Sequence, residues 1–298
     1  MNLIRYKKAE KAQMAVMTED LAIYDLSFSD FQEIDARASA REMSIHSFIK
    51  EQIQDQLPIN KKISDLELLI PIETEEVWAA GVTYQKSRMA RNYESSHQEL
   101  NNETCYDKVY HAERPEIFLK STRKRTLGPN QQLYLRNDSN WQVPEPELGL
   151  VINHQAKIVG YIIGNDLSCR DIEGENPLYL PQAKVWKGSC SIGPSIRLVE
   201  TVENPYDLTI TCRIYRKNEL VFNQSSSTSQ LKRKFDELVS YLVKNNELFD
   251  GVVLLSGTAI VPPDDFTLQD DDHIEIEIPE IGTLTNAVKM MVEQAAHC

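Results

Sequence analysis

Residues 143–152 read VPEPELGLVI, a stretch that combines a buried strand with an unusual pair of charges. From Leu148 onward every position is apolar or glycine, which is typical of a strand covered on both faces. Glu145 and Glu147 stand two positions apart at its start, so an extended chain points both carboxylates to the same side. Like charges at this spacing are destabilising unless water or a shared cation relieves them. The stretch therefore predicts either a solvated acidic pair or a metal site at the entrance to a buried strand.

Runs of β-branched residues elsewhere predict a mainly β fold. They cover residues 158–163, 208–215, 252–255 and 274–278, and both TITCRIY and HIEIEI alternate with a period of two. Many short strands with few helices predict a sandwich, roll or barrel. We expect one long amphipathic helix over residues 229–245, with its apolar face packed against the sheet.

The first 68 residues differ in character and predict a small α+β domain. Its expected strands and helix cover residues 3–6, 15–17, 21–24 and 31–54. A polar piece with a proline, residues 52–64, is typical of a linker. We therefore expect an N-terminal domain of residues 1–68 and a second domain of residues 69–298 that carries the function.

The composition indicates an acidic, intracellular protein. The chain has 298 residues, with 32 Lys+Arg against 45 Asp+Glu, and its formal charge of -13 repels nucleic acids and anionic membranes. Its five cysteines are scattered and form no CxxC pair, which is typical of a reducing compartment. No stretch approaches the roughly 18 apolar residues of a membrane span. We expect a cytoplasmic protein with no nucleic-acid or membrane partner.

A third carboxylate follows in the segment GYIIGNDLSCRD, residues 160–171, where a strand ends in a polar turn. A return strand would carry Asp166 back beside Glu145 and Glu147. Three carboxylate oxygens suit a hard divalent cation, Mg²⁺ first and Mn²⁺ or Ca²⁺ next. The alternative for Asp166 is a turn cap.

A proline-containing loop, GENPLYLPQAK at residues 174–184, comes next. Long ordered loops in compact domains tend to be functional. Lys184 stands between Ala183 and the pair Val185-Trp186, a setting that can partly desolvate its ammonium group. Such a lysine acts as a base or anchors a carboxylate, and the alternative is an ordinary surface lysine.

Taken together, these segments resemble the fumarylacetoacetate hydrolase superfamily. The matching pieces run in order between Val77 and Lys289: EPELGLVI, GYIIGNDLSCRD, the QAK loop, GSCSIGP, SGTAIVP and IGTL. The resemblance implies a mixed β-sandwich roll, with Glu145, Glu147 and Asp166 as ligands of a magnesium-type ion. It also implies a 2-oxo acid substrate that completes the coordination of the metal, and assembly into homodimers or homotetramers.

Within the superfamily, RPEIFLK at residues 114–120, EGENPLYLPQAK and TAIVP look most like the 2-keto-3-deoxy-D-arabinonate dehydratase branch. That resemblance implies a lyase that removes water from a 2-keto-3-deoxy sugar acid and leaves 2-oxoglutarate semialdehyde. Lys184, its pKa lowered by burial and by the cation, would remove a proton, and Glu116 would act as the acid, although the two roles can be exchanged. Contacts to the substrate are implied for Arg170, Glu173 and Thr283, with Ser87, Arg88 and Arg91 as further candidates.

One departure from the superfamily pattern bears on the reaction. Hydrolytic members carry a His-x-x-Glu dyad after a Gly-x-x-Tyr turn, whereas the corresponding places here hold Ser87 and Ala90. Neither side chain is a general base at neutral pH. The alternative function is a C–C hydrolase for acylpyruvates that uses Glu116, His97 or His111, and a third is a binding protein without turnover.

Overall fold

The structure is a computed structural model, and it describes residues 1–96, 104–249 and 251–292. Its strands are β1 (Asn2–Lys8), β2 (Lys11–Met17), β3 (Ile23–Asp25), β4 (Glu76–Gly81), β5 (Glu116–Thr122), β6 (Thr126–Leu127), β7 (Leu133–Leu135), β8 (Gln142–Val143), β9 (Pro146–Ile152), β10 (Ile158–Asp166), β11 (Ser168–Cys169), β12 (Cys190–Leu198), β13 (Thr209–Arg216), β14 (Glu219–Ser227), β15 (Val252–Leu255), β16 (His273–Ile278) and β17 (Gly282–Met290). Its helices are α1 (Phe31–Ala40), α2 (Ile45–Ile53), α3 (Gln85–Ser96), α4 (Cys105–His111), α5 (Arg170–Glu175), α6 (Leu180–Lys184) and α7 (Phe235–Leu242), and its 3₁₀ turns are η1 (Ile63–Asp65), η2 (Pro177–Tyr179), η3 (Val199–Thr201) and η4 (Thr228–Gln230).

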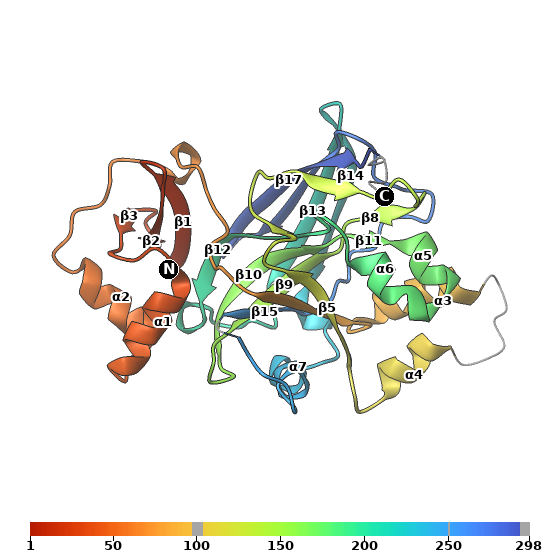
Figure 1. The fold of residues 1–298 in the computed structure, drawn as a ribbon, viewed down its shortest axis with the longest axis horizontal. Coiled ribbons are helices and arrows are strands. Elements are labelled where there is room, and N and C mark those ends of the chain that lie inside the picture. The colour runs from red at the N-terminus through yellow and green to blue at the C-terminus, as the bar shows by residue number, and fades with distance from the viewer. Residues whose placement is uncertain (97–103, 250, 293–298) are drawn as a thin grey trace, which may run out of the picture.

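Most strands belong to two sheets that share an apolar core. The larger sheet of the described residues has ten strands in the order β3-β2-β1-β12-β10-β9-β15-β4-β5, with β6 beside β12. The smaller has five, in the order β14-β13-β16-β17-β7 (Figure 1). Side chains from β9, β10 and β15 meet those from β13, β16 and β17 in one core cluster. The predicted mixed β-sandwich roll is therefore confirmed.

Strand β9 is the buried strand that the opening stretch predicts. All seven of its residues are buried, and it pairs antiparallel with β10 on one side and β15 on the other. Leu148, Leu150 and Ile152 face the core between the sheets, whereas Val151 faces a second core beneath α1 and α2. Alternate residues thus pack into different cores, which is why the sequence is apolar at every position.

The predicted N-terminal helix over residues 31–54 is two helices. Asp30 caps the start of α1, and Ser44 caps the start of α2. Glu42 between them has a φ of 53°, a left-handed conformation that a continuous helix cannot contain. The break lets both helices lay their apolar residues on the same side of the sheet.

The first 68 residues do not form a separate sheet. Strand β1 pairs with β12, so β1, β2 and β3 extend the large sheet beyond the predicted boundary. The core cluster beneath α1 and α2 also contains Val77, Val151 and Ile192 from the rest of the chain. The division at residue 68 stays a prediction, and both the sheet and the core cross it.

The helix predicted over residues 229–245 is shorter than expected. Residues 228–230 form the turn η4, and Leu231 then forms a β-bridge with Tyr84. The N–H of Lys232 donates to the carbonyl of Thr83, so this stretch is held extended, and α7 begins only at Phe235. Its apolar residues pack into the main core as predicted.

Helices α3, α4, α5 and α6 gather at one end of the molecule, opposite α1 and α2 (Figure 1). Helix α5 follows β11 directly, and α3 contacts α5. These helices surround the starts of β9 and β5 and the end of β10, where the predicted site residues lie. Within the described part of the chain, no helix is both long and apolar enough to cross a membrane.

Candidate active site

The hairpin of β9 and β10 brings the three predicted carboxylates together. Gly164 pairs with Glu147 across the hairpin, and the N–H of Asp166 donates to the carbonyl of Glu145 at 3.0 Å. One oxygen from each of Glu145, Glu147 and Asp166 lies within 4.8 Å of the other two, and all three residues are buried. The solvated alternative for the glutamate pair is therefore wrong.

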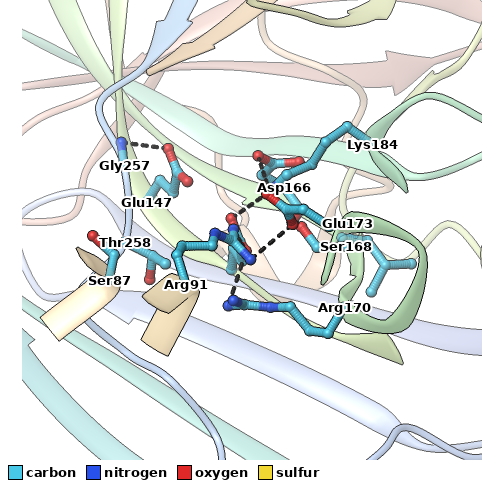
Figure 2. A network of polar contacts seen from close by, with 12 residues as sticks. Ser87, Arg91, Glu147, Asp166, Ser168, Arg170, Glu173, Lys184, Gly257 and Thr258 are labelled. Carbon is cyan, nitrogen blue, oxygen red and sulfur yellow. Dashed lines mark hydrogen bonds and ion pairs between the residues drawn. The ribbon is translucent and has the colours of Figure 1, made fainter. Parts of the chain in front are cut away.

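Three cationic side chains surround Glu145. Lys184 Nζ lies 2.7 Å from its Oε2, and Arg91 Nη2 and Arg170 Nη2 lie 2.7 and 3.0 Å from its Oε1. Arg91, which enters from α3, also pairs with Glu173 of α5 at 2.7 Å, and Figure 2 shows it reaching between the carboxylates. Burial opposes ionisation of Glu145, but the charges of Lys184, Arg91 and Arg170 outweigh it and hold the pKa of Glu145 well below its usual range.

Glu147 has a different environment. Its Oε2 accepts a hydrogen bond from the backbone N–H of Gly257 at 2.6 Å (Figure 2). Burial, together with the nearby charges of Asp166 and Glu145, raises the pKa of Glu147 well above its usual range. The pKa values of Glu145 and Glu147 thus shift in opposite directions, although the two carboxylates are neighbours. A divalent cation held by these carboxylates would relieve the repulsion between their negative charges.

Lys184 is completely enclosed. Its Nζ contacts Glu145, the Oδ2 of Asp166 at 3.1 Å and the Oγ of Ser168 at 2.6 Å. The surface-lysine alternative is therefore wrong. The expected lowering of its pKa is also absent from this arrangement: burial acts in that direction, but Asp166, Glu145 and Glu173 outweigh it and raise the pKa of Lys184.

Glu116 faces the same pocket from the first position of β5. It pairs with Gly81 of β4, and its carboxylate lies over that glycine. Burial, with a smaller contribution from the charge of Glu173, raises the pKa of Glu116 to about 7. A carboxyl group with this pKa can both donate and accept a proton near neutral pH.

Some of the other predicted site residues line the pocket, and the rest lie outside its lining. Ser87, Arg91 and Glu173 line the pocket together with the carboxylates and Lys184. Arg170 contacts Glu145, and Arg88 lies beside Asp107 at 3.8 Å. Thr283 lines a different cavity, between the β2–β3 turn and the start of β17, so we exclude it from the proposed substrate contacts.

The histidines of the hydrolase alternative gain no support. His111 is exposed, its Nε2 lies 3.2 Å from Arg88 Nη1, and it is not among the described residues that line the pocket. His97 lies outside the described residues. Ser87 Oγ donates to the carbonyl of Tyr84 at 2.8 Å, so this hydroxyl helps to hold the first turn of α3.

Sequence reasoning missed two residues at the site. Thr258, next to the Gly257 that binds Glu147, lines the pocket and is buried. Lys120 lies 2.7 Å from Asp166 Oδ1, outside the pocket lining. Both belong to segments with a recognisable pattern, SGTAIVP and EIFLKST, and Lys120 is four positions from Glu116 in the sequence.

The donor set fits a hard divalent cation. One oxygen from each of the three carboxylates lies within 4.8 Å of the other two, so the three side chains are grouped as the ligands of one cation would be. All are oxygens from acidic side chains, which is the set that Mg²⁺, Mn²⁺ and Ca²⁺ prefer.

Comparison with known proteins agrees with this geometry. The family model "Fumarylacetoacetate (FAA) hydrolase C-terminal" matches residues 87–289. A protein of Haloferax volcanii named probable 2-keto-3-deoxyxylonate dehydratase is 44% identical over 271 residues, which cover 91% of this chain and 92% of that protein. A 2-dehydro-3-deoxy-D-arabinonate dehydratase of Saccharolobus solfataricus is 44% identical over 228 residues, 76% of each chain. The solved structure of a 2-keto-3-deoxy-D-arabinonate dehydratase complexed with magnesium and 2,5-dioxopentanoate has a TM-score of 0.82 at 36% identity, covering 98% of this chain and 100% of that chain.

Proposed function

Since this chain belongs to the fumarylacetoacetate hydrolase family, we propose that it is a magnesium-dependent hydro-lyase acting on a 2-keto-3-deoxy sugar acid. Its substrate would be a pentonate such as 2-keto-3-deoxy-D-arabinonate, and its product 2-oxoglutarate semialdehyde. One observation carries the proposal: Glu116 and Lys184 face the same buried pocket as the carboxylates of Glu145, Glu147 and Asp166. The dehydratase names of the relatives support the same reaction.

Glu145, Glu147 and Asp166 would hold the metal, because one oxygen of each lies within 4.8 Å of the other two. When bound, a divalent cation polarises the ketone of a chelated 2-oxo acid and competes for the carboxylates that otherwise keep Lys184 protonated. Each of the three carboxylate residues is buried, so the protein shields this site from bulk solvent. A dry site strengthens every charge interaction within it.

Lys184 and Glu116 would move the protons. Lys184 takes the proton from C3, next to the ketone, and the hydroxyl at C4 leaves as water with a proton from Glu116. Tautomerisation then places the aldehyde at C5, so the overall change is the loss of one water molecule. The pKa of about 7 suits Glu116 to the acid role near neutral pH.

The remaining polar residues of the pocket would orient the sugar acid. Ser87 and Arg91 enter from the same side of α3, and Thr258 lies beside them in Figure 2. Glu173 is buried and pairs with Arg91, which also pairs with Glu145. We propose Ser87, Arg91 and Glu173 as determinants of which hydroxyl groups the pocket accepts.

The dehydratase reading is favoured over the C–C hydrolase by the position of the candidate bases. A hydrolase needs a general base that holds an attacking water near the substrate carbonyl. Ser87 is occupied with the Tyr84 carbonyl, and His111 pairs with Arg88 outside the pocket. Among the described residues of that alternative, Glu116 is the one that lines the pocket.

The experiment is a substrate test with purified protein. With Mg²⁺ present, 2-keto-3-deoxy-D-arabinonate should be consumed and the aldehyde signal of 2-oxoglutarate semialdehyde should appear in the proton NMR spectrum. Excess chelator should stop the reaction, and Glu116→Gln should abolish it while leaving Mg²⁺ binding intact. Cleavage of an acylpyruvate with the sugar acid untouched would establish the hydrolase instead.

We further propose that the enzyme is cytoplasmic and works as a homodimer or homotetramer. The first part is supported by the unpaired state of Cys105, Cys169, Cys190 and Cys212. The second rests on the family resemblance, and light scattering of the purified protein tests it.

A further inference from the structure

Lys120 is a buried cation for which the proposed reaction has no role. It lies on β5 with 0% of its surface exposed, and lysine is almost never fully buried unless it is paired. Its Nζ lies 2.7 Å from Oδ1 of Asp166, 2.7 Å from the carbonyl oxygen of Leu167 and 2.5 Å from that of Lys184. Two of these contacts are hydrogen bonds, to the carbonyl oxygens of Leu167 and Lys184, and the third is an ion pair with Asp166. Lys120 does not line the pocket, so it does not contact a substrate bound there.

The three partners of Lys120 belong to segments that carry different parts of the site. Asp166 and Leu167 mark the end of β10, and Lys184 is the last residue of α6. The ring of Trp186 closes the remaining side, with its centroid 5.1 Å from Nζ. Lys120 thus joins a proposed metal ligand to the main chain of the proposed base.

Asp166 lies between two lysines, one on each carboxylate oxygen. Lys120 holds Oδ1 from outside the pocket, and Lys184 holds Oδ2 at 3.1 Å from inside it. A carboxylate fixed at one oxygen keeps a constant orientation when the contacts of the other oxygen change. The oxygen on the pocket side is the one free to exchange partners.

Strand β5 also relates this anchor to the proposed acid. Glu116 and Phe118 stand two positions apart and share one face, and Lys120 follows where the pairing of β5 with β4 shifts register. Glu116 and Phe118 line the pocket, and the ring centroid of Phe118 lies 5.5 Å from Lys184 Nζ. A single strand thus carries the acid, a wall of the pocket and the anchor of the base.

We propose that Lys120 is a positioning residue that fixes the Asp166 carboxylate for the divalent cation and the Lys184 backbone for proton transfer. The second half rests on the proposed function, whereas the first requires only a metal site. Removing the positive charge would by itself strengthen metal binding, because Lys120 repels a cation. Loss of the fixed orientation of Asp166 would instead weaken metal binding. Changes to the residues that orient metal ligands typically weaken metal binding about 10–100-fold.

The test compares Lys120→Met with the wild type, because methionine keeps an unbranched chain and removes the three donors. Mn²⁺ alone serves as the probe, and its dissociation constant is measured by titration with electron paramagnetic resonance, without substrate. We expect binding weaker by about 10–100-fold. At saturating metal we expect kcat to fall at least about 10-fold with KM changed far less, because Lys120 does not touch the substrate.

Arg216→Met is the matched control. Arg216 pairs with Asp272, another fully buried aspartate, at 2.8 and 2.9 Å, and neither residue lines the pocket. This variant should lose stability as Lys120→Met does, yet bind Mn²⁺ and turn over like the wild type. A purely structural role for Lys120 predicts that the two variants behave alike.

Lys120→Arg provides a second measurement if the methionine variant does not fold. It keeps the charge but replaces a compact ammonium with a planar guanidinium that cannot reproduce the two hydrogen bonds and the ion pair. We expect weaker Mn²⁺ binding and a reduced kcat here as well.

Unchanged or tighter Mn²⁺ binding in the variant that folds, or an unchanged kcat at saturating metal, overturns the proposal. Wild-type protein that binds no Mn²⁺ overturns both this inference and the proposed function. Wild-type protein that binds Mn²⁺ but leaves the sugar acid untouched overturns only the proposed function and the proton-transfer half, and the Mn²⁺ titration still decides the metal half.

Discussion

The carboxylate of Glu116 occupies the space that a side chain on Gly81 would need. A Cβ on Gly81 would lie 2.0 Å from Oε2 of Glu116, well inside contact distance. The two residues are directly paired across β4 and β5. The glycine of the Gly-x-x-Tyr turn therefore determines where the proposed acid can sit.

Gly81→Ala should displace Glu116 and lower kcat by about 100-fold or more, since a shift near 1 Å in a proton donor can have that effect. Steady-state kinetics measure the loss, and circular dichroism checks the fold. In a Glu116→Gln background, Gly81→Ala should lower kcat little further, because both changes affect the same proton-transfer step. Equal losses in both backgrounds would mean that Gly81 acts independently of Glu116.

Glu116 should make the stability of the metal-free protein depend on pH. The pKa of Glu116 is about 7 in the folded protein, above the value of a glutamate in the unfolded chain. Its contribution to folding stability is therefore present at low pH and is lost as pH rises through about 7. Relative to Glu116→Gln, the wild type should lose about 2–3 kcal/mol between pH 5 and pH 8. Urea denaturation in chelator measures the difference. The exposed Glu113→Gln serves as the control and should show no such trend.

Glu147→Gln should separate stability from metal binding. Since burial and the neighbouring carboxylates raise the pKa of Glu147, removing its charge should raise the melting temperature of the metal-free protein, more at pH 8 than at pH 6. Excess Mg²⁺ should stabilise the wild type by about 2–3 kcal/mol at 100 times its dissociation constant and leave the variant unchanged. Glu277→Gln, in the other sheet and paired with Arg213, should keep the full response. A normal Mg²⁺ response in Glu147→Gln would remove it from the ligand set.

Arg91→Met should strongly destabilise the protein, because Arg91 pairs with two buried carboxylates at 2.7 Å each. Breaking a buried ion pair from one side typically destabilises by about 3–5 kcal/mol. Adding Glu173→Gln should recover part of the loss, since one uncompensated charge is removed. Arg213→Met, which breaks the partly exposed pair with Glu277, should lose no more than about 1 kcal/mol. Chemical denaturation of the four proteins tests this, and a small loss in Arg91→Met would contradict it.

The local sequence pattern was sufficient to predict the hairpin of β9 and β10 and the proposed metal ligands that it carries. The apolar run of β9, the polar end of β10 and the short connection between them are properties of neighbouring residues. Antiparallel pairing of adjacent strands then leaves little choice about where Asp166 lies relative to Glu145 and Glu147. The strands around residues 158–163, 208–215, 252–255 and 274–278 were predictable for the same reason.

Errors arose where a distant segment determined the outcome. The amphipathic pattern that predicted a helix from residue 229 is interrupted because Leu231 and Lys232 bind Tyr84 and Thr83. Neither interaction leaves a periodic signal in the sequence, because the partners are far apart along the chain.

By itself, the sequence determined the carboxylate set, the central buried strand and a mainly β fold, since these follow from side-chain alternation and short connections, whereas the sandwich roll was implied by the family resemblance. Only the tertiary structure decided the charge state of the site. Lys184, Arg91, Arg170 and Lys120 come from four elements and converge on Glu145 and Asp166. Electrostatic effects depend on distance in space and on burial, and both are set only when these segments pack together.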